Sequence, residues 1–111
     1  MLVYKILRQK EYSDLHNLGS LIGSAVDILD GYVHLSTAEQ LPETLRKHYA
    51  GEGGLHLLAL EDALLGGDLR WEPSRGGALF PHLYRELRLA DILWKREITL
   101  GHEGHETGSL E

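Results

Sequence analysis

Cysteine is absent from this 111-residue chain, and basic residues are fewer than acidic ones. Without cysteine there is no disulfide, no thiolate metal site and no cysteine nucleophile. Such a composition fits a reducing compartment. The 11 Lys and Arg residues against 17 Asp and Glu residues give a net charge of -6 with His neutral. Because phosphate contacts dominate nucleic-acid affinity, this charge argues against bulk nucleic-acid binding but leaves room for a small local anion site.

Long apolar runs are also missing. The first apolar run, Leu2 to Leu7, is interrupted by Tyr4 and Lys5. It is too short for a signal peptide or a membrane span. We therefore expect a cytoplasmic protein with no membrane partner.

The residues that are present are typical of one globular unit. A content of 42% hydrophobic and 25% charged residues is usual for such proteins, and the length fits one domain. We predict a single domain over residues 1–99. From residue 100 to residue 111 large apolar side chains nearly vanish, which predicts a disordered tail. Its terminal Leu-Glu could be a cloning remnant.

Local patterns predict an α+β domain of five or six short strands around two helices. Strand-forming residues predict strands over residues 2–7, 55–60, 69–72 and 92–98. Apolar spacing predicts two helices, over residues 8–18 and 38–49. Residues 19–30 are interpreted as an ordered loop with at most a short strand. Residues 80–84 are interpreted as a non-helical aromatic segment, because the residue before Pro81 favours extended backbone.

Pro42 is the irregular feature of the second helix. A proline in a helix interior costs roughly 3 kcal/mol because it cannot donate to the helical hydrogen bonds. The helix therefore either kinks at this point or begins at Leu41-Pro42 after a separate turn.

The stretch from Asp30 to Thr37 is a first candidate site. Strand alternation places Tyr32, His34 and Ser36 on one face. Imidazole can act as a general acid or base, and the helix that follows Ser36 and Thr37 can offer backbone N–H groups to an anion. The alternative is a partly buried histidine bonded to backbone, with a serine that only caps the helix.

The stretch from Arg70 to Gly77 is a second candidate. Arg70 and Arg75 can clamp a phosphate or carboxylate, and Trp71 can stack on a base. Glu72 can hold a ribose hydroxyl or stabilise a cationic transition state. Gly76 lets backbone approach a ligand closely. The alternative is a tryptophan that fills the core, beside an Arg70–Glu72 surface pair of little energetic value.

His82 lies between Phe80 and Tyr84 and is either a second site histidine or a core residue. The seven histidines show no His-x-x-x-His spacing in the ordered part of the chain, so we expect no metal site.

These stretches resemble a known family. Residues 30–37, 70–77 and 79–84, in that order, resemble the small bacterial family of domains of unknown function numbered 952. The resemblance covers about residues 2 to 98.

Val33-His34-Leu35-Ser36 is in turn similar to a His-Leu-Ser signature of the RNA 2′-phosphotransferases, which use NAD. That similarity implies an ADP-ribosyltransferase-like fold, in which a bent or split antiparallel sheet grips NAD or an ADP-ribosyl group. Enzymes of that fold usually carry Arg or His on the first strand, where Lys5 is the nearest candidate here. The late catalytic glutamate of that fold corresponds to Glu72, to Glu86 or to neither.

The leading hypothesis is therefore a pocket for a nucleotide-type or phosphorylated small anion, such as NAD or ADP-ribose. If the protein is an enzyme, we expect an NAD-dependent ADP-ribosyl or phosphate transferase. His34 and Ser36 would orient the ribose, with Glu72 as the acidic partner. The other predicted ligand contacts are Tyr32, Thr37, Arg70, Trp71, Arg75, Gly76, His82 and Tyr84. The alternatives are a non-catalytic binding module on the same fold and, more remotely, a metal-assisted hydrolase.

Overall fold

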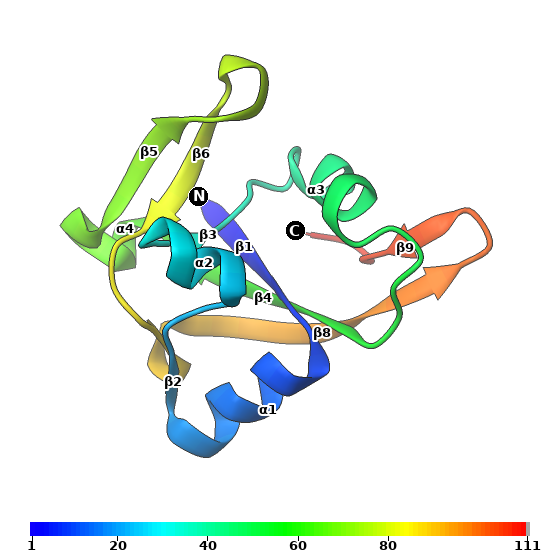
Figure 1. The fold of residues 1–111 in the computed structure, drawn as a ribbon, viewed down its shortest axis with the longest axis horizontal. Coiled ribbons are helices and arrows are strands. Elements are labelled where there is room, and N and C mark those ends of the chain that lie inside the picture. Colours follow the sequence, from blue (N-terminus) through cyan, green and yellow to red (C-terminus); the bar gives the residue numbers. More distant parts are fainter. Residues whose placement is uncertain (111) are drawn as a thin grey trace.

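A four-stranded antiparallel sheet forms the centre of the computed structural model, which describes residues 1–110 and only the backbone of Arg75 (Figure 1). Its strand order is β1-β4-β8-β9. The bounds are β1 Leu2–Leu7, β4 Leu55–Glu61, β8 Ile92–Gly101 and β9 Gly104–Glu106. The strands predicted over residues 2–7, 55–60 and 92–98 are confirmed, and β4 lies between β1 and β8 as its apolar sequence indicates.

A second antiparallel sheet has the order β3-β6-β5. The bounds are β3 Val33–His34, β5 Leu69–Pro73 and β6 Leu79–Leu83. A small pair, β2 Ser20–Leu21 and β7 Leu87–Arg88, completes the strands. The two larger sheets join where Tyr4 of β1 pairs with Ser36, two residues after the end of β3. The arrangement is a small α+β domain with curled antiparallel sheets, as predicted.

Four α-helices accompany the sheets in the described residues. They are α1 Gln9–Leu18, α2 Ala25–Asp30, α3 Leu41–His48 and α4 Asp62–Leu65, with short 3-10 turns at Gly66–Asp68, Arg75–Gly77 and Leu89–Asp91. The α1 helix ends at Gly19, whose φ of 81° is the left-handed conformation that glycine adopts at little cost. The α3 helix begins at Leu41, with Pro42 in its first turn. The second interpretation of Pro42 is therefore correct.

The α2 helix was not predicted, because residues 19–30 were interpreted as a loop. Capping contacts rather than a buried apolar stripe define it. The Ser24 side chain accepts from the backbone N–H of Asp27, the Asp27 carboxylate accepts from the N–H of Ser24, and Gly31 ends the helix. Its large apolar side chains, Val26, Ile28 and Leu29, are exposed, so the helical period carries little hydrophobic signal.

Both faces of β1 and β4 are buried, which gives the domain two apolar clusters. On one face, Val3 and Leu7 pack with Leu15 of α1. On the opposite face, Tyr4 and Ile6 pack with Leu45 of α3. The helices α1 and α3 accordingly lie on opposite sides of the sheet (Figure 1).

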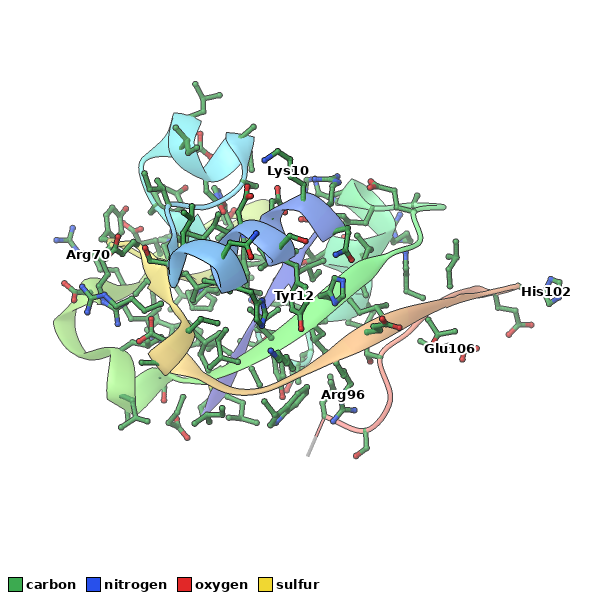
Figure 2. The ribbon with its side chains drawn as sticks, turned by 90° about the horizontal axis from the view of Figure 1, so that it is seen from below. Lys10, Tyr12, Arg70, Arg96, His102 and Glu106 are labelled. Atoms are coloured by element: carbon green, nitrogen blue, oxygen red, sulfur yellow. The ribbon has the colours of Figure 1, made fainter. Side chains whose placement is uncertain are left out.

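The prediction of a disordered tail from residue 100 is wrong for residues 100–106. Strand β8 continues to Gly101 and forms a hairpin with β9, and His102 lies at the tip of this projecting arm (Figure 2). The Tyr4 hydroxyl also donates to the carbonyl of Leu110 at 2.9 Å. Backbone pairing forms the hairpin without a large apolar core, which is why composition does not reveal it. No helix within residues 1–110 is long and apolar enough to cross a membrane.

Candidate functional site

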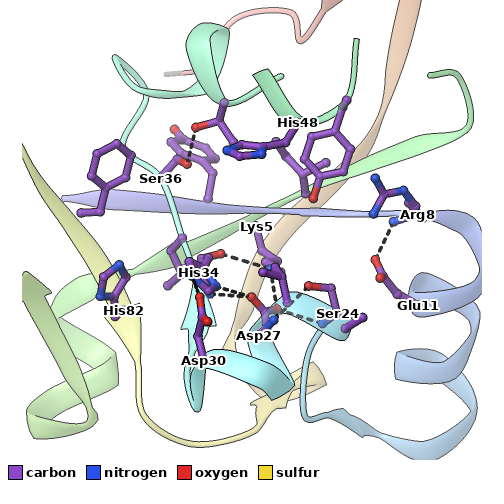
Figure 3. Close-up of a pocket in the computed structure, with 18 of the residues that line it drawn as sticks. Lys5, Arg8, Glu11, Ser24, Asp27, Asp30, His34, Ser36, His48 and His82 are labelled. Carbon is purple, nitrogen blue, oxygen red and sulfur yellow. Dashed lines mark hydrogen bonds and ion pairs between the residues drawn. The ribbon is translucent and has the colours of Figure 1, made fainter. Parts of the chain in front are cut away.

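A cavity of about 580 Å³ opens between the two sheets beside His34 (Figure 3). Residues of β1, α2 and α3 line it together with the end of β3 and with β6. Its polar and aromatic lining residues include Lys5, Arg8, Ser24, Asp27, Asp30, His34, Ser36, Tyr49 and His82. Its size is usual for a small-molecule site.

Asp27 of α2 lies at the base of the cavity with a fully buried side chain. Its carboxylate accepts hydrogen bonds from Lys5 Nζ at 2.7 Å, Ser24 N at 2.9 Å and His34 N at 3.0 Å, and contacts His34 Nδ1 at 2.6 Å. Burial by itself would raise the pKa of Asp27. The hydrogen bond from His34 and the charge of Lys5 outweigh it, so the pKa lies well below its usual value and the group stays a carboxylate.

Lys5 is the buried cation of this site, with 3% of the residue exposed. Its ammonium pairs with Asp27 and also donates to the carbonyl of His34 at 3.2 Å. A buried ammonium needs such partners, because an uncompensated buried charge is strongly destabilising. Lys5 is therefore held in the wall of the cavity by these contacts with Asp27 and His34.

His34 has a carboxylate on each side of its ring. Nδ1 contacts Asp27, and Nε2 lies 3.1 Å from Oδ2 of the more exposed Asp30. Ser36, two residues further, is buried and shares a hydrogen bond of 3.1 Å with Thr44 of α3. The predicted common face of His34 and Ser36 therefore borders the cavity.

Tyr32 and His82 form a ring cluster against His34. The Tyr32 ring stacks on His82 with centroids 4.1 Å apart and lies 4.6 Å from the His34 ring. The His34 and His82 rings are 5.5 Å apart, and the two residues face each other across β3 and β6. The structure thus brings together three predicted site residues that lie up to 50 positions apart in the sequence.

Glu72 joins this cluster from β5. Its Oε1 accepts from the Tyr84 hydroxyl at 2.6 Å and contacts His82 Nδ1 at 2.8 Å. These hydrogen bonds, from Tyr84 first and His82 second, lower the pKa of Glu72, which therefore stays a carboxylate. Arg70 lies over the Tyr84 ring at 4.6 Å from its centroid.

Other predicted residues lie away from the cavity. Tyr32, Arg70, Trp71, Glu72 and Tyr84 are not among its lining residues, and Trp71 packs against the first apolar cluster, in line with the core alternative.

Thr37 and Gly76 have local backbone roles. The Thr37 hydroxyl caps the N–H of Gln40, and Pro42 has no N–H to offer an anion at the start of α3. Gly76 has a φ of 63° in its turn. The side chain of Arg75 lies outside the described residues, but its neighbour Ser74 lines the cavity. Of the second predicted stretch, Ser74 therefore reaches the cavity.

Asp27, Arg8 and Tyr49 were missed by sequence reasoning. Ser24 and Asp27 have the spacing of a helix cap, which is the one local signal for Asp27. Arg8 donates to both carboxylate oxygens of Glu52 and lies 4.6 Å from the centre of the Tyr49 ring. Burial raises the pKa of Tyr49 to about 12. Within residues 1–110, no three His, Asp or Glu side chains gather in a way that could hold a metal ion.

The fold and this cavity define a small α+β domain with a carboxylate-anchored histidine site. The chain belongs to the family described as protein of unknown function (DUF952), whose family model matches residues 6–95. This confirms the family that the motifs indicate.

Solved structures of one bacterial protein are similar to this chain. The crystal structure of protein CC0527 from Caulobacter crescentus is 46% identical with a TM-score of 0.90, over 95% of this chain and 92% of that one. Its solution NMR structure, also 46% identical, has a TM-score of 0.84 over 94% and 90% of the two chains. A comparison with curated proteins finds no match.

Proposed function

We propose that the chain binds a small phosphorylated ligand of the nucleotide type in the cavity beside His34. The observation that carries this proposal is the meeting of His34, Ser36 and His82 at one cavity of about 580 Å³. A pocket of this volume with a few convergent polar groups is the usual form of a small-molecule site.

Arg8 is the cation best placed to meet a phosphate. Glu52 occupies its Nε and one terminal nitrogen, while a guanidinium carries five N–H donors in all. Lys5, in contrast, is held by Asp27 and His34. A phosphate at the cavity would therefore interact with Arg8, and the imidazole of His34 would supply a further donor.

NAD and ADP-ribose are the ligands that the His-Leu-Ser resemblance favours. His34 and Ser36 would contact the ribose. Tyr49 and Phe80, which line the cavity, would contact the base in place of Trp71 or Tyr84. In a transferase of this kind the cavity would hold NAD as a substrate for ADP-ribosyl transfer.

A non-catalytic binding module is the second candidate, and the place of Glu72 favours it. Glu72 does not line the cavity, and its Oε1 already serves His82 and Tyr84. The acidic residue expected of a transferase thus forms its hydrogen bonds outside the cavity lining.

Backbone NMR titration with NAD, ADP-ribose, AMP and inorganic phosphate tests the binding proposal. We expect shifts at the amides of His34, Ser36 and Arg8, with none at Lys10 on the exposed face of α1. Tryptophan fluorescence is a poor reporter, because neither Trp71 nor Trp94 lines the cavity. Absence of shifts at millimolar ligand overturns the proposal.

Slow release of nicotinamide from NAD separates the two candidates. A transferase would release it, and His34→Ala would abolish the release. Binding without release, in the parent protein and in His34→Ala alike, identifies a binding module.

A further inference from the structure

The two histidines that border the cavity are held in matching ways. His34 of β3 and His82 of β6 are paired across the sheet, with ring centroids 5.5 Å apart. Each ring has its Nδ1 against a carboxylate, Asp27 at 2.6 Å and Glu72 at 2.8 Å. A carboxylate at Nδ1 fixes the orientation of an imidazole and leaves Nε2 as the nitrogen that can exchange a proton.

His34 is placed to give a proton. Its Nε2 lies 3.1 Å from Asp30 Oδ2, in addition to the contact of Nδ1 with Asp27. An imidazole can form hydrogen bonds with two carboxylates only by donating from both ring nitrogens. Only the protonated ring has an N–H at both nitrogens. Asp30 is the more accessible partner, with 39% of its side chain exposed, so a ligand oxygen can replace it at Nε2.

His82 is placed to take a proton. Glu72 stays a carboxylate under its two hydrogen bonds, so His82 Nδ1 donates to it, and in the neutral ring Nε2 then carries a lone pair. The residue is 4% exposed, and among the side chains that the structure describes, which exclude that of Arg75, Nε2 has no hydrogen-bond partner. A buried polar atom without a partner is costly unless a ligand or water meets it.

We propose that His82 and His34 form a general base and general acid pair that hydrolyses a phosphodiester. The inference rests on the proposed binding of a phosphorylated ligand in the same cavity. His82 Nε2 takes a proton from water while the water oxygen bonds to phosphorus. The bond from phosphorus to the leaving ester oxygen breaks, and His34 Nε2 gives that oxygen its proton. The products are a phosphate monoester and an alcohol, and no co-reactant besides water is needed.

The general acid of this pair, His34, favours an ester over NAD as the substrate. Nicotinamide leaves NAD as a neutral base and requires no proton. A sugar alkoxide is a poor leaving group until it is protonated, so a positioned acid accelerates its departure. A nucleoside phosphodiester, such as a 2′,3′-cyclic nucleoside monophosphate, therefore fits the two histidines best.

Two substrates with different leaving groups test the assignment. One is a 2′,3′-cyclic nucleoside monophosphate, which releases a sugar oxygen. The other is the p-nitrophenyl ester of the same nucleoside monophosphate, whose nitrophenolate leaves without a proton. His34→Asn and His82→Asn suit the test, because the asparagine amide can still donate to Asp27 or Glu72 and preserve the fold.

We expect His82→Asn to lower kcat/KM for both substrates by roughly 10²–10⁴-fold. We expect His34→Asn to cause a loss of that size for the cyclic substrate and a far smaller one for the nitrophenyl ester. His16→Asn on α1, outside the cavity, is the matched control and should leave both rates unchanged. Equal losses for both substrates in His34→Asn, or no turnover by the parent protein, overturn the inference.

Calorimetry with the unreactive nucleoside monophosphate separates the two proposals. Binding without turnover overturns the acid–base pair and leaves the binding function intact. Absence of binding overturns both.

Discussion

The two histidine–carboxylate pairs of the cavity differ mainly in the surroundings of the acid. Asp27 is fully buried and is contacted by Lys5, Ser24 and both the ring and the backbone of His34. Glu72 has 35% of its side chain exposed and serves two side chains through one oxygen. In the first pair the acid is the buried partner, whereas in the second pair the histidine is buried, with 5% of its side chain exposed.

This difference separates folding from site chemistry. The Asp27–His34 pair joins β1, α2 and β3, so a change there alters stability and the site together. The Glu72–His82 pair joins two neighbouring strands that backbone pairing already holds. A change there should affect the histidine with little effect on the fold.

The largest effect is expected from Asp27→Asn. The substitution leaves the Lys5 ammonium buried without its counter-charge, which typically costs about 3–5 kcal/mol of unfolding free energy. Urea denaturation measures this cost. Asp30→Asn, at the exposed side of the same histidine, is the control, and a loss for Asp27→Asn no larger than for Asp30→Asn would contradict the account.

Low pH should weaken the same Asp27–His34 pair. Because the pKa of Asp27 is lower in the folded chain than its usual value of 3.8, its contribution is complete above that value and is lost as the pH falls below it. Unfolding free energies measured between neutral pH and pH 2 should therefore fall more steeply in the parent than in Asp27→Asn. Parallel curves would show that Asp27 is not the source.

Glu72→Gln should sharpen the contrast. The amide keeps the shape of the side chain, so the urea midpoint should stay close to that of the parent protein. The ring nitrogens of His82 should nevertheless change their NMR shifts. A carboxylate at position 72 can only accept and so requires a proton on His82 Nδ1, whereas a glutamine amide can also donate. Unchanged ring shifts would disprove the proposed tautomer.

The smallest effect is expected from Arg70→Ala. Its guanidinium lies over the Tyr84 ring at an exposed position, where such contacts contribute about 0.5–1 kcal/mol. Thermal unfolding of Arg70→Ala measures this contribution. Arg88→Ala, at another exposed arginine, is the control. A loss of several kcal/mol of unfolding free energy would show that Arg70 makes stabilising contacts beyond the one with Tyr84.

Much of the fold could be predicted from local patterns. The central strands β1 and β4 have runs of strand-forming and apolar residues, and Gly19 marks the end of α1. The α2 helix could not be predicted this way, because Ser24, Asp27 and Gly31 define it through caps while Val26 and Leu29 remain exposed.

The candidate site was only partly visible in the sequence. His34 and Ser36 were found because strand alternation places them on one face. The contact of His34 with His82 depends on the register of β3 and β6, and a sequence does not contain that register in local form. Asp27 was not predicted as a site residue, because its role depends on contacts with Lys5 and His34, which belong to two other elements.

The joint between the two sheets has a consequence for the timescale of their motion. Tyr4 and Ser36 exchange two backbone hydrogen bonds, of 2.8 and 2.9 Å, while Leu35 donates to Pro81 on the other side. Separation of the sheets must break the two Tyr4–Ser36 bonds together, whereas the Leu35–Pro81 bond lies within the second sheet and can persist. Amide deuterium uptake at Tyr4 and Ser36 should therefore occur at one common rate, which is the rate at which the walls of the cavity part.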